Sequence, residues 1–195
     1  MRIHLIRHGL TKSNEERRYT GFNDILLSDK GRELLHELKS KTVFPKPDYI
    51  ICSPMKRCKE TFQILFEGLN VDRFVDDLRE TNFGDWEGKT YIDLKNDPDY
   101  QKWISNFEVN CPPNGESFIT FKERVVLAFD NIVTESKGLH EDVLVVTHGG
   151  VIRVLMEHYA DNGIKFYNWN IPNGLGYTLE FGDEITYSIL GSHDE

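Results

Sequence analysis

Residues 142–150, DVLVVTHGG, decide the fold expected for this chain. Val143–Val146 is an unbroken apolar run, as found in a strand that is covered on both faces of a sheet. His148 follows it, directly before two glycines that let the backbone turn tightly and approach a ligand closely. The stretch therefore predicts a central strand over 142–147 and a helix over 151–159, with a histidine where the strand ends.

The N-terminus repeats this arrangement. Ile3–Ile6 reads as a second buried strand, and Arg7 and His8 follow it side by side before Gly9. A folded core gains nothing from an arginine and a histidine exposed together at a glycine turn. We therefore interpret the pair as functional.

Strands and helices alternate along the rest of the chain. Strands are expected over 49–52 and, weakly, 71–75, followed by a C-terminal hairpin of 175–181 and 185–190. Helices are expected over 10–17, 28–41, 54–66, 117–137 and, as one or two short pieces, 91–107. This order predicts an α/β fold, a three-layer α/β/α sandwich with a mostly parallel central sheet. We expect one domain, 1–195, in which residues 85–113 form a small helical cap.

Composition narrows the class of protein. Hydrophobic residues make up 39% and charged residues 28%, an ordinary balance for a soluble globular chain. The net charge of −9 argues against nucleic acid as a partner, and no apolar stretch is long enough to cross a membrane. The three cysteines form no CxxC pair, and the apolar N-terminal stretch is too short for a secretion signal. We expect a cytoplasmic protein.

Charged and polar side chains follow the predicted strands. In parallel α/β folds the ligand crevice lies beyond the carboxyl ends of the strands, where these side chains would meet. They are Arg7, His8, Arg57, Glu80 and His148.

This set of side chains has a chemical meaning. Arginine forks match phosphate oxygens, and a neutral imidazole can attack phosphorus. A carboxyl group can protonate the leaving oxygen and later activate water. Guanidinium groups can stabilise the charged transition state, so neither a metal nor a cofactor is expected. The residues predict phosphoryl transfer through a phosphohistidine.

Six blocks of this sequence resemble the histidine phosphatase superfamily, which has the phosphoglycerate-mutase-like fold. They occur in the expected order and cover most of the chain. The blocks are LIRHGLT (5–11), RRYTGFNDILLSDKG (17–31), SPMKRC (53–58), LRETNFGDWEG (78–88), PPNGES (112–117) and VVTHGGVIR (145–153).

The resemblance assigns roles to individual residues. It makes His8 the phosphorylated nucleophile and Glu80 the proton donor. It places around the phosphate Arg7, Arg57 and His148, with further contacts from Asn14 and the Gly149 amide. It places at the substrate entrance Thr20, Gly21 and Phe22.

The segment after Glu80 separates branches of the superfamily. Here FGDWEGKT (83–90) stands where mutases carry a stretch with glutamate, arginine and tyrosine close together. The chain is more similar to the phosphatases, especially those that remove the 5′-phosphate from α-ribazole phosphate in cobalamin assembly. Two positions depart from the usual pattern, Leu10 in place of glutamate and Leu26 in place of proline.

Several alternatives stay open at this stage. The chain could be a broad-specificity phosphatase of small phosphomonoesters, a mutase-type phosphotransferase, or a phosphate-binding module without activity. Glu87 lies in the same irregular region as Glu80 and competes with it for the acid role. The cap aromatics could line a substrate ring or form the core of a lid; they are Phe22, Tyr100, Trp103 and Phe107. The oligomeric state is left undecided.

Overall fold

The computed structural model describes residues 1–160 and 163–191. Within these ranges a six-stranded sheet has the order β3-β2-β4-β1-β5-β6. The strands are β1 (Arg2–Arg7), β2 (Tyr49–Cys52), β3 (Arg73–Phe74), β4 (Asp142–Thr147), β5 (Gly176–Phe181) and β6 (Ile185–Ile189). The helices are α1 (Lys12–Glu15), α2 (Asp29–Lys41), α3 (Lys56–Leu65), α4 (Tyr91–Leu94), α5 (Pro98–Ser105), α6 (Phe118–Ser136) and α7 (Gly149–Tyr159). Three short 3-10 turns are η1 (Asp76–Leu78), η2 (Gly84–Trp86) and η3 (Phe166–Asn168).

The sheet is mostly parallel, as predicted. Strand β4 pairs in parallel with both β1 and β2, and β2 pairs in parallel with β3. Strands β5 and β6 form the predicted antiparallel hairpin at one edge. The pairing of β1 with β4 places Arg7 opposite Thr147, and the His8 amide donates to the Thr147 carbonyl at 2.9 Å. Both histidine turns therefore leave the sheet at the same edge.

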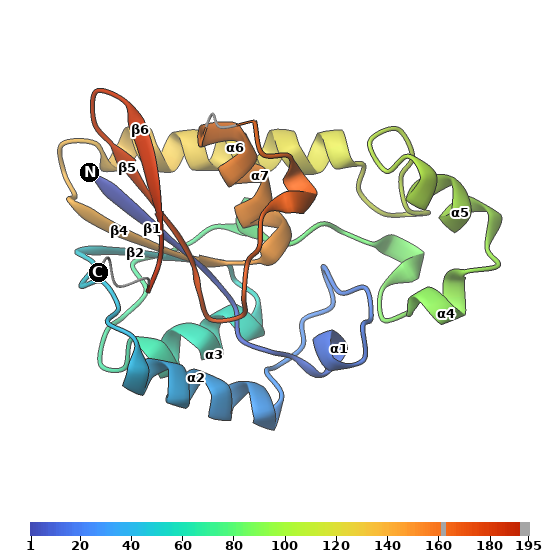
Figure 1. Cartoon of the computed structure of the whole chain (residues 1–195), viewed down its shortest axis with the longest axis horizontal. Helices are drawn as coiled ribbons and strands as arrows, with labels where there is room; N and C mark the ends of the chain where they lie inside the picture. The colour runs from blue at the N-terminus through green and yellow to red at the C-terminus, as the bar shows by residue number, and fades with distance from the viewer. Residues whose placement is uncertain (161–162, 192–195) are drawn as a thin grey trace.

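Helices cover both faces of the sheet, which gives the three predicted layers. Helices α2 and α3 lie on one side and α6 and α7 on the other (Figure 1). Neighbouring side chains of a strand point to opposite faces, so each central strand contributes to two cores. Leu5 and Val145 pack with residues of α6 and α7, whereas Ile6 and Val146 pack with residues of α2 and α3.

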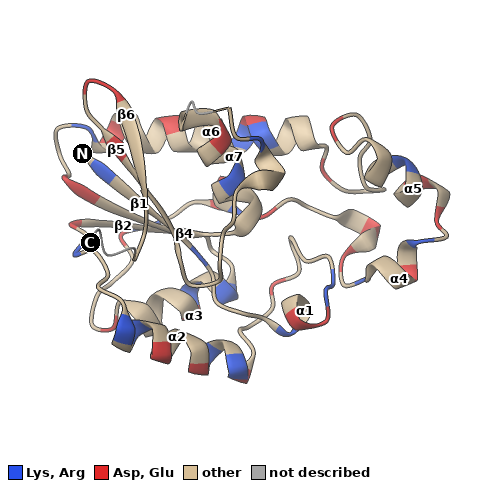
Figure 2. Cartoon of the chain, viewed as in Figure 1, with Lys and Arg blue, Asp and Glu red and all other residues tan. Residues whose placement is uncertain are grey.

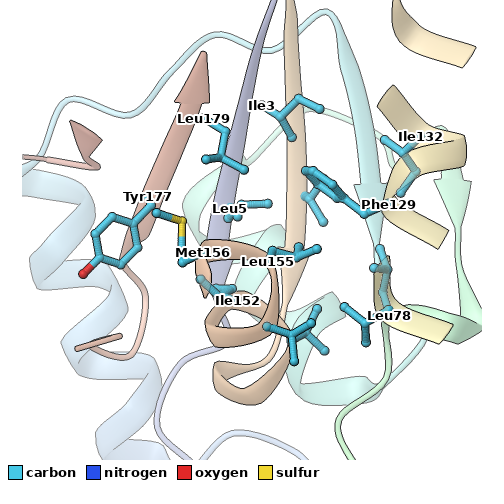
Figure 3. Close-up of a cluster of buried hydrophobic side chains, with 14 of the residues drawn as sticks. Ile3, Leu5, Leu78, Phe129, Ile132, Ile152, Leu155, Met156, Tyr177 and Leu179 are labelled. Atoms are coloured by element: carbon cyan, nitrogen blue, oxygen red, sulfur yellow. The ribbon is translucent and has the colours of Figure 1, made fainter. Parts of the chain in front are cut away.

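The core between β1, α6 and α7 is the larger of the two. Figure 3 shows Phe129 and Ile132 of α6 close to the sheet, with Ile152 and Leu155 of α7 beside them. All four side chains are at most 1% exposed. Their helical spacing, three residues apart in each pair, puts them on the covered face of each helix.

Hydroxyl side chains set the start of two long helices. The Ser28 oxygen accepts from the Gly31 amide at the start of α2, and the Ser117 oxygen accepts from the Thr120 amide at the start of α6. Such caps satisfy backbone donors that have no partner inside the helix. The predicted helices over 28–41 and 117–137 are therefore confirmed to within about one residue.

Three elements differ from the prediction. Helix α1 is a single turn rather than residues 10–17, because Thr11 and Asn14 close a capping box and Arg17 adopts a left-handed backbone conformation with φ of 54°. Strand β3 is only two residues long. Pro54 lies before α3 instead of in its first turn, since Met55 is the residue that caps the helix.

A small helical cap stands beside the sheet, as predicted. Helices α4 and α5 lie at one end of the molecule, away from the strands (Figure 1). Their own buried cluster contains Trp86, Leu94 and Tyr100. In residues 1–160 and 163–191 no helix combines the length and apolarity needed to cross a membrane.

Replacing Phe129 with alanine should lower the free energy of unfolding by about 3–5 kcal/mol, because it leaves a cavity between α6 and the sheet. Urea unfolding would measure the change. Leu127→Ala on the same helix is the matched control: its side chain is 64% exposed, so we expect a change within about 0.5 kcal/mol. Equal losses in the two variants would contradict this assignment of the core.

Candidate active site

His8 lies just beyond β1 with its ring held in one orientation. Nδ1 lies 2.7 Å from the carbonyl oxygen of Gly9. A carbonyl oxygen only accepts hydrogen bonds, so Nδ1 must carry the proton and Nε2 keeps a free lone pair. The backbone is fixed as well, because the Asn173 amide group donates to the His8 carbonyl at 2.9 Å and Thr61 accepts from the Gly9 amide at 2.8 Å.

The environment keeps this imidazole neutral. Burial lowers the pKa of His8 well below its usual value, and the positive charges of Arg57 and Arg7 lower it further. An imidazole that is unprotonated at Nε2 and fixed by its Nδ1 proton is a competent nucleophile.

His148 caps the start of α7, and its ring lies against that of His8. The two ring centroids are 5.2 Å apart in an edge-to-face arrangement. Arg57 Nε lies 3.3 Å from Nδ1 of His148, and a guanidinium can only donate, so this nitrogen accepts. Nε2 is 2.8 Å from the Ser53 hydroxyl and therefore carries the proton. Burial, followed by the charge of Arg57, lowers the pKa of His148 well below its usual value.

Arg7 presents a buried donor. Its Nη1 donates to the Ile171 carbonyl at 2.7 Å, whereas its Nε has no hydrogen-bond partner within the described chain. A Cβ added to Gly149 would lie 3.2 Å from this Nε, so the glycine keeps the donor accessible beside the start of α7. A buried N–H without a partner is costly, and an anionic ligand would satisfy it.

Arg57 ties helix α3 to the loop of residues 21–23. The side chain is 1% exposed. Its Nη2 donates to the Gly21 carbonyl at 2.7 Å and its Nη1 to the Asn23 carbonyl at 2.8 Å. Gly21 has no room for a side chain, because a Cβ there would lie 1.6 Å from the Thr81 carbonyl oxygen.

The Glu80 side chain contacts the first turn of α7. Its Oε2 accepts from the Gly150 amide at 2.9 Å and its Oε1 from the Thr81 amide at 3.0 Å. A Cβ on Gly150 would lie 2.2 Å from Oε1, so only glycine allows this approach. The structure thus brings together two neutral imidazoles, the guanidinium groups of Arg7 and Arg57, and the carboxyl group of Glu80.

A cavity of about 270 Å³ adjoins the site at Glu80 and Gly150. Half of its lining residues are aromatic: Tyr19, Phe83, Trp103, Phe107, Phe118, Phe121, Phe166 and Tyr167. Arg18 and Arg153 add positive charge to it. His8, Arg7 and Arg57 lie outside this lining, so the cavity would receive what is attached to the phosphate rather than the phosphate itself.

Of the residues expected at the substrate entrance, only some line the cavity. Thr20 lines the cavity. The Phe22 ring stacks under the Arg79 guanidinium at 4.8 Å and lies outside the cavity lining. Asn14 is expected at the phosphate instead; its carboxamide oxygen accepts from the amide and hydroxyl of Thr11, which fixes the turn after His8.

Some cap aromatics line the cavity and others form the core of the cap. Trp103 and Phe107 line the cavity. Tyr100 is 1% exposed, and its hydroxyl is hydrogen-bonded to that of Tyr19 at 2.6 Å inside the cap.

Sequence reasoning missed two contributors. Glu87, considered only as a rival to Glu80, accepts from the amides of Gly21, Phe22, Asn23 and Phe83, so it shapes the entrance loop. Arg153 lines the cavity four residues after Gly149, a spacing that puts both on one helix face and that would have predicted its position.

Charged residues on helix α2 are arranged differently from those of the site. Along α2, acidic and basic residues are interspersed (Figure 2), and they pair at the surface as Arg32 with Asp29 and Lys41 with Glu37. The buried arginines of the site are different, because backbone carbonyls and a histidine nitrogen accept most of their hydrogen bonds.

Residues 3–188 match the sequence profile of the histidine phosphatase superfamily, branch 1. The chain belongs to this family. The adenosylcobalamin/alpha-ribazole phosphatase of Escherichia coli K12 is 30% identical over 98% of this chain and 96% of its own length. Phosphoglycerate mutase-like protein 4 of Arabidopsis thaliana is 36% identical over 97% of this chain and 84% of its own.

A solved structure agrees with these relatives. The alpha-ribazole phosphatase from Shigella flexneri superposes with a TM-score of 0.88 at 25% identity, over 98% of this chain and 96% of that one. Family and relatives together identify the protein as a phosphatase, a phosphoric monoester hydrolase that acts on small molecules.

Stability should fall as the pH drops below about 6.5, because His8 and His148 have lowered pKa values in the folded chain. The unfolded chain then binds protons that the folded chain excludes, at a cost of up to about 1.4 kcal/mol per pH unit for each histidine. Urea unfolding at several pH values would measure the slope. His148→Gln removes one of the two groups and should flatten the slope; an unchanged slope would show that His148 protonates freely in the folded protein.

Proposed function

We propose that this phosphatase removes the 5′-phosphate of α-ribazole 5′-phosphate, in the assembly of the lower-ligand arm of cobalamin, through a phosphohistidine at His8. The orientation of His8 carries the proposal. Its Nδ1 is hydrogen-bonded to the Gly9 carbonyl, so Nε2 has a free lone pair with which to attack phosphorus. The unpaired Nε of Arg7 is available to bind the phosphate. The names of the relatives supply the substrate.

In the first step Nε2 of His8 attacks phosphorus as the bond to the ester oxygen breaks. Glu80, in its protonated form, gives that oxygen a proton, so the alcohol leaves neutral. The phosphoryl oxygens are held by Arg7, Arg57 and the Gly149 amide, with Asn14 fixing the turn beside them. His148 joins this set when its Nε2 proton leaves the Ser53 hydroxyl for a phosphoryl oxygen. No metal or cofactor takes part in the step.

In the second step water attacks the phosphohistidine. The Glu80 carboxylate accepts a proton from the water as the P–N bond breaks. Inorganic phosphate leaves, and His8 regains its lone pair on Nε2. Glu80 is then protonated again and ready for the next ester.

The aromatic cavity supports a substrate with a flat ring. It begins at Glu80, where the ester oxygen would lie, and continues between Trp103, Phe107 and Tyr167. Aromatic walls favour a stacked base over a simple sugar. Thr20 lines its mouth, and the loop of Gly21 and Phe22 stands beside it.

A broad-specificity phosphatase of small phosphomonoesters is the second candidate. Sequence identity leaves room for it, because the Arabidopsis protein, which is named for its likeness to phosphoglycerate mutase, is 36% identical to this chain and the E. coli α-ribazole phosphatase 30%. We also propose a cytoplasmic location and no nucleic-acid partner, on the net charge of −9 and on three cysteines that are all free thiols.

His8→Ala should abolish phosphatase activity, with the loss exceeding about 10³-fold, because no other nucleophile replaces Nε2. Rapid quenching of the wild-type enzyme with ³²P-labelled substrate should trap a phosphoenzyme that is labile in acid and stable in alkali. The same experiment on His8→Ala is the control. Activity equal to that of the wild type would overturn the mechanism.

Tyr167→Ala should lower kcat/KM for α-ribazole 5′-phosphate by about tenfold, because one aromatic wall of the cavity is lost. Ribose 5-phosphate, which lacks the base, should lose less than about threefold. Tyr91→Ala is the matched control, a 53% exposed tyrosine of the cap outside the cavity lining. Wild-type kcat/KM values that are equal across these and other phosphomonoesters would leave the phosphatase but remove the α-ribazole assignment.

A further inference from the structure

Arg124 lies in the second turn of α6 and uses every donor of its guanidinium group. Nε and Nη2 bind the two carboxylate oxygens of Glu116 at 2.7 and 2.8 Å. Nη1 donates to the carbonyls of Asp77 and Arg79 at 2.7 and 2.9 Å. The second proton of Nη2 goes to the carbonyl of Glu80 at 3.0 Å. Five N–H groups thus make five hydrogen bonds, the maximum for arginine.

Glu116 fixes this arginine from the end of the cap. It lies directly before Ser117, the residue that caps α6. Both of its carboxylate oxygens accept hydrogen bonds from the guanidinium group. Its Oε2 also accepts from the Asn82 amide at 3.3 Å. The side chains are 17% exposed for Arg124 and 11% for Glu116. A bidentate pair that is so little exposed holds its geometry better than a surface ion pair.

The segment that carries Glu80 is fixed along its whole length. Arg124 accounts for the carbonyls of Asp77, Arg79 and Glu80, and the Thr147 hydroxyl donates to the Leu78 carbonyl at 2.8 Å. The Glu80 side chain then reaches the Gly150 amide. Four consecutive peptide carbonyls are therefore positioned by two side chains, one from α6 and one from β4.

We propose that Arg124 and Glu116 are positioning residues for the proton transfer by Glu80. Arg124 lies outside the lining of the aromatic cavity, whereas Glu116 contributes to it. Together the two side chains fix the backbone from which the acid extends. The proposal rests on the role of Glu80 in the proposed function. Displacement of a catalytic group by about 1 Å can cost about 100-fold in rate, so loosening this segment should impair the acid without weakening the phosphate contacts.

The leaving group distinguishes this role from a merely structural one. An alkyl phosphate releases a strongly basic alkoxide and needs the proton from Glu80 as its P–O bond breaks. p-Nitrophenyl phosphate releases a stable phenolate and needs the proton far less. Because kcat/KM covers steps only up to formation of the phosphoenzyme, it reports the transfer to His8 and not the later hydrolysis.

The experiment compares kcat/KM for ribose 5-phosphate and p-nitrophenyl phosphate in Arg124→Lys and Glu116→Gln. Lysine lacks the fork that binds a carboxylate and three carbonyls together. We expect the alkyl ester to lose at least about tenfold and the aryl ester less than about threefold. Glu80→Gln sets the scale for complete loss of the acid. Arg73→Lys, in an ion pair with Glu135 at the surface, is the matched control and should leave both rates unchanged.

The ratio of the two kcat/KM values decides the proposal. Loss of folded protein lowers both rates equally and leaves the ratio unchanged, so poor folding of a variant cannot imitate the expected result. Because Glu116 also lines the cavity, Arg124→Lys is the deciding variant, and an unchanged ratio in it would overturn the positioning role. If Glu80→Gln itself leaves the ratio unchanged, the acid assigned in the proposed function is wrong, which is a separate failure.

Discussion

The parallel pairing of β1 with β4 is the constraint on which the site depends. The register that sets Arg7 opposite Thr147 also brings His8 beside His148, two residues that are 140 positions apart in the sequence. Both strands are buried on both faces. A shift of the pairing by one residue would move every apolar side chain of the strand into the opposite core, where it would not fit its neighbours. The hydrophobic cores therefore fix the distance between the two imidazoles, and the glycines that follow each strand only direct the chain away from them.

Much of this arrangement could be predicted from the sequence because it depends on local signals. The apolar run Val143–Val146 and the glycines after His8 and His148 indicate strands that end in functional turns, and Ser28 and Ser117 mark the helix starts. The cavity wall was harder to predict, because Phe166 and Tyr167 meet Trp103 and Phe107 only through the path of the chain after α7. Glu116 lies in the block PPNGES, but neither it nor Arg124 could be given a role from the sequence, because a charged pair at the start of an amphipathic helix looks like a solvated surface until its contacts are known.

The histidines show how one neighbour can set both charge and orientation. Arg57 lowers the pKa of both rings, and its Nε also fixes which nitrogen of His148 accepts a hydrogen bond. The Gly9 carbonyl has the corresponding effect on His8. Both imidazoles are neutral because they are buried among guanidinium groups. The pocket therefore keeps the positive charge of its arginines, which a negatively charged phosphate would balance.

The entrance loop at Gly21–Asn23 has a further consequence for how the cap and the sheet communicate. Its amides face the Glu87 carboxylate of the cap, and two of its carbonyls face the Arg57 guanidinium of α3. The loop thus lies between an anion and a cation, with its N–H groups toward the carboxylate and two carbonyls toward the guanidinium. The peptide group between Gly21 and Phe22 donates to Glu87 and accepts from Arg57, so a single peptide bond ties the cap to the arginine of the phosphate pocket.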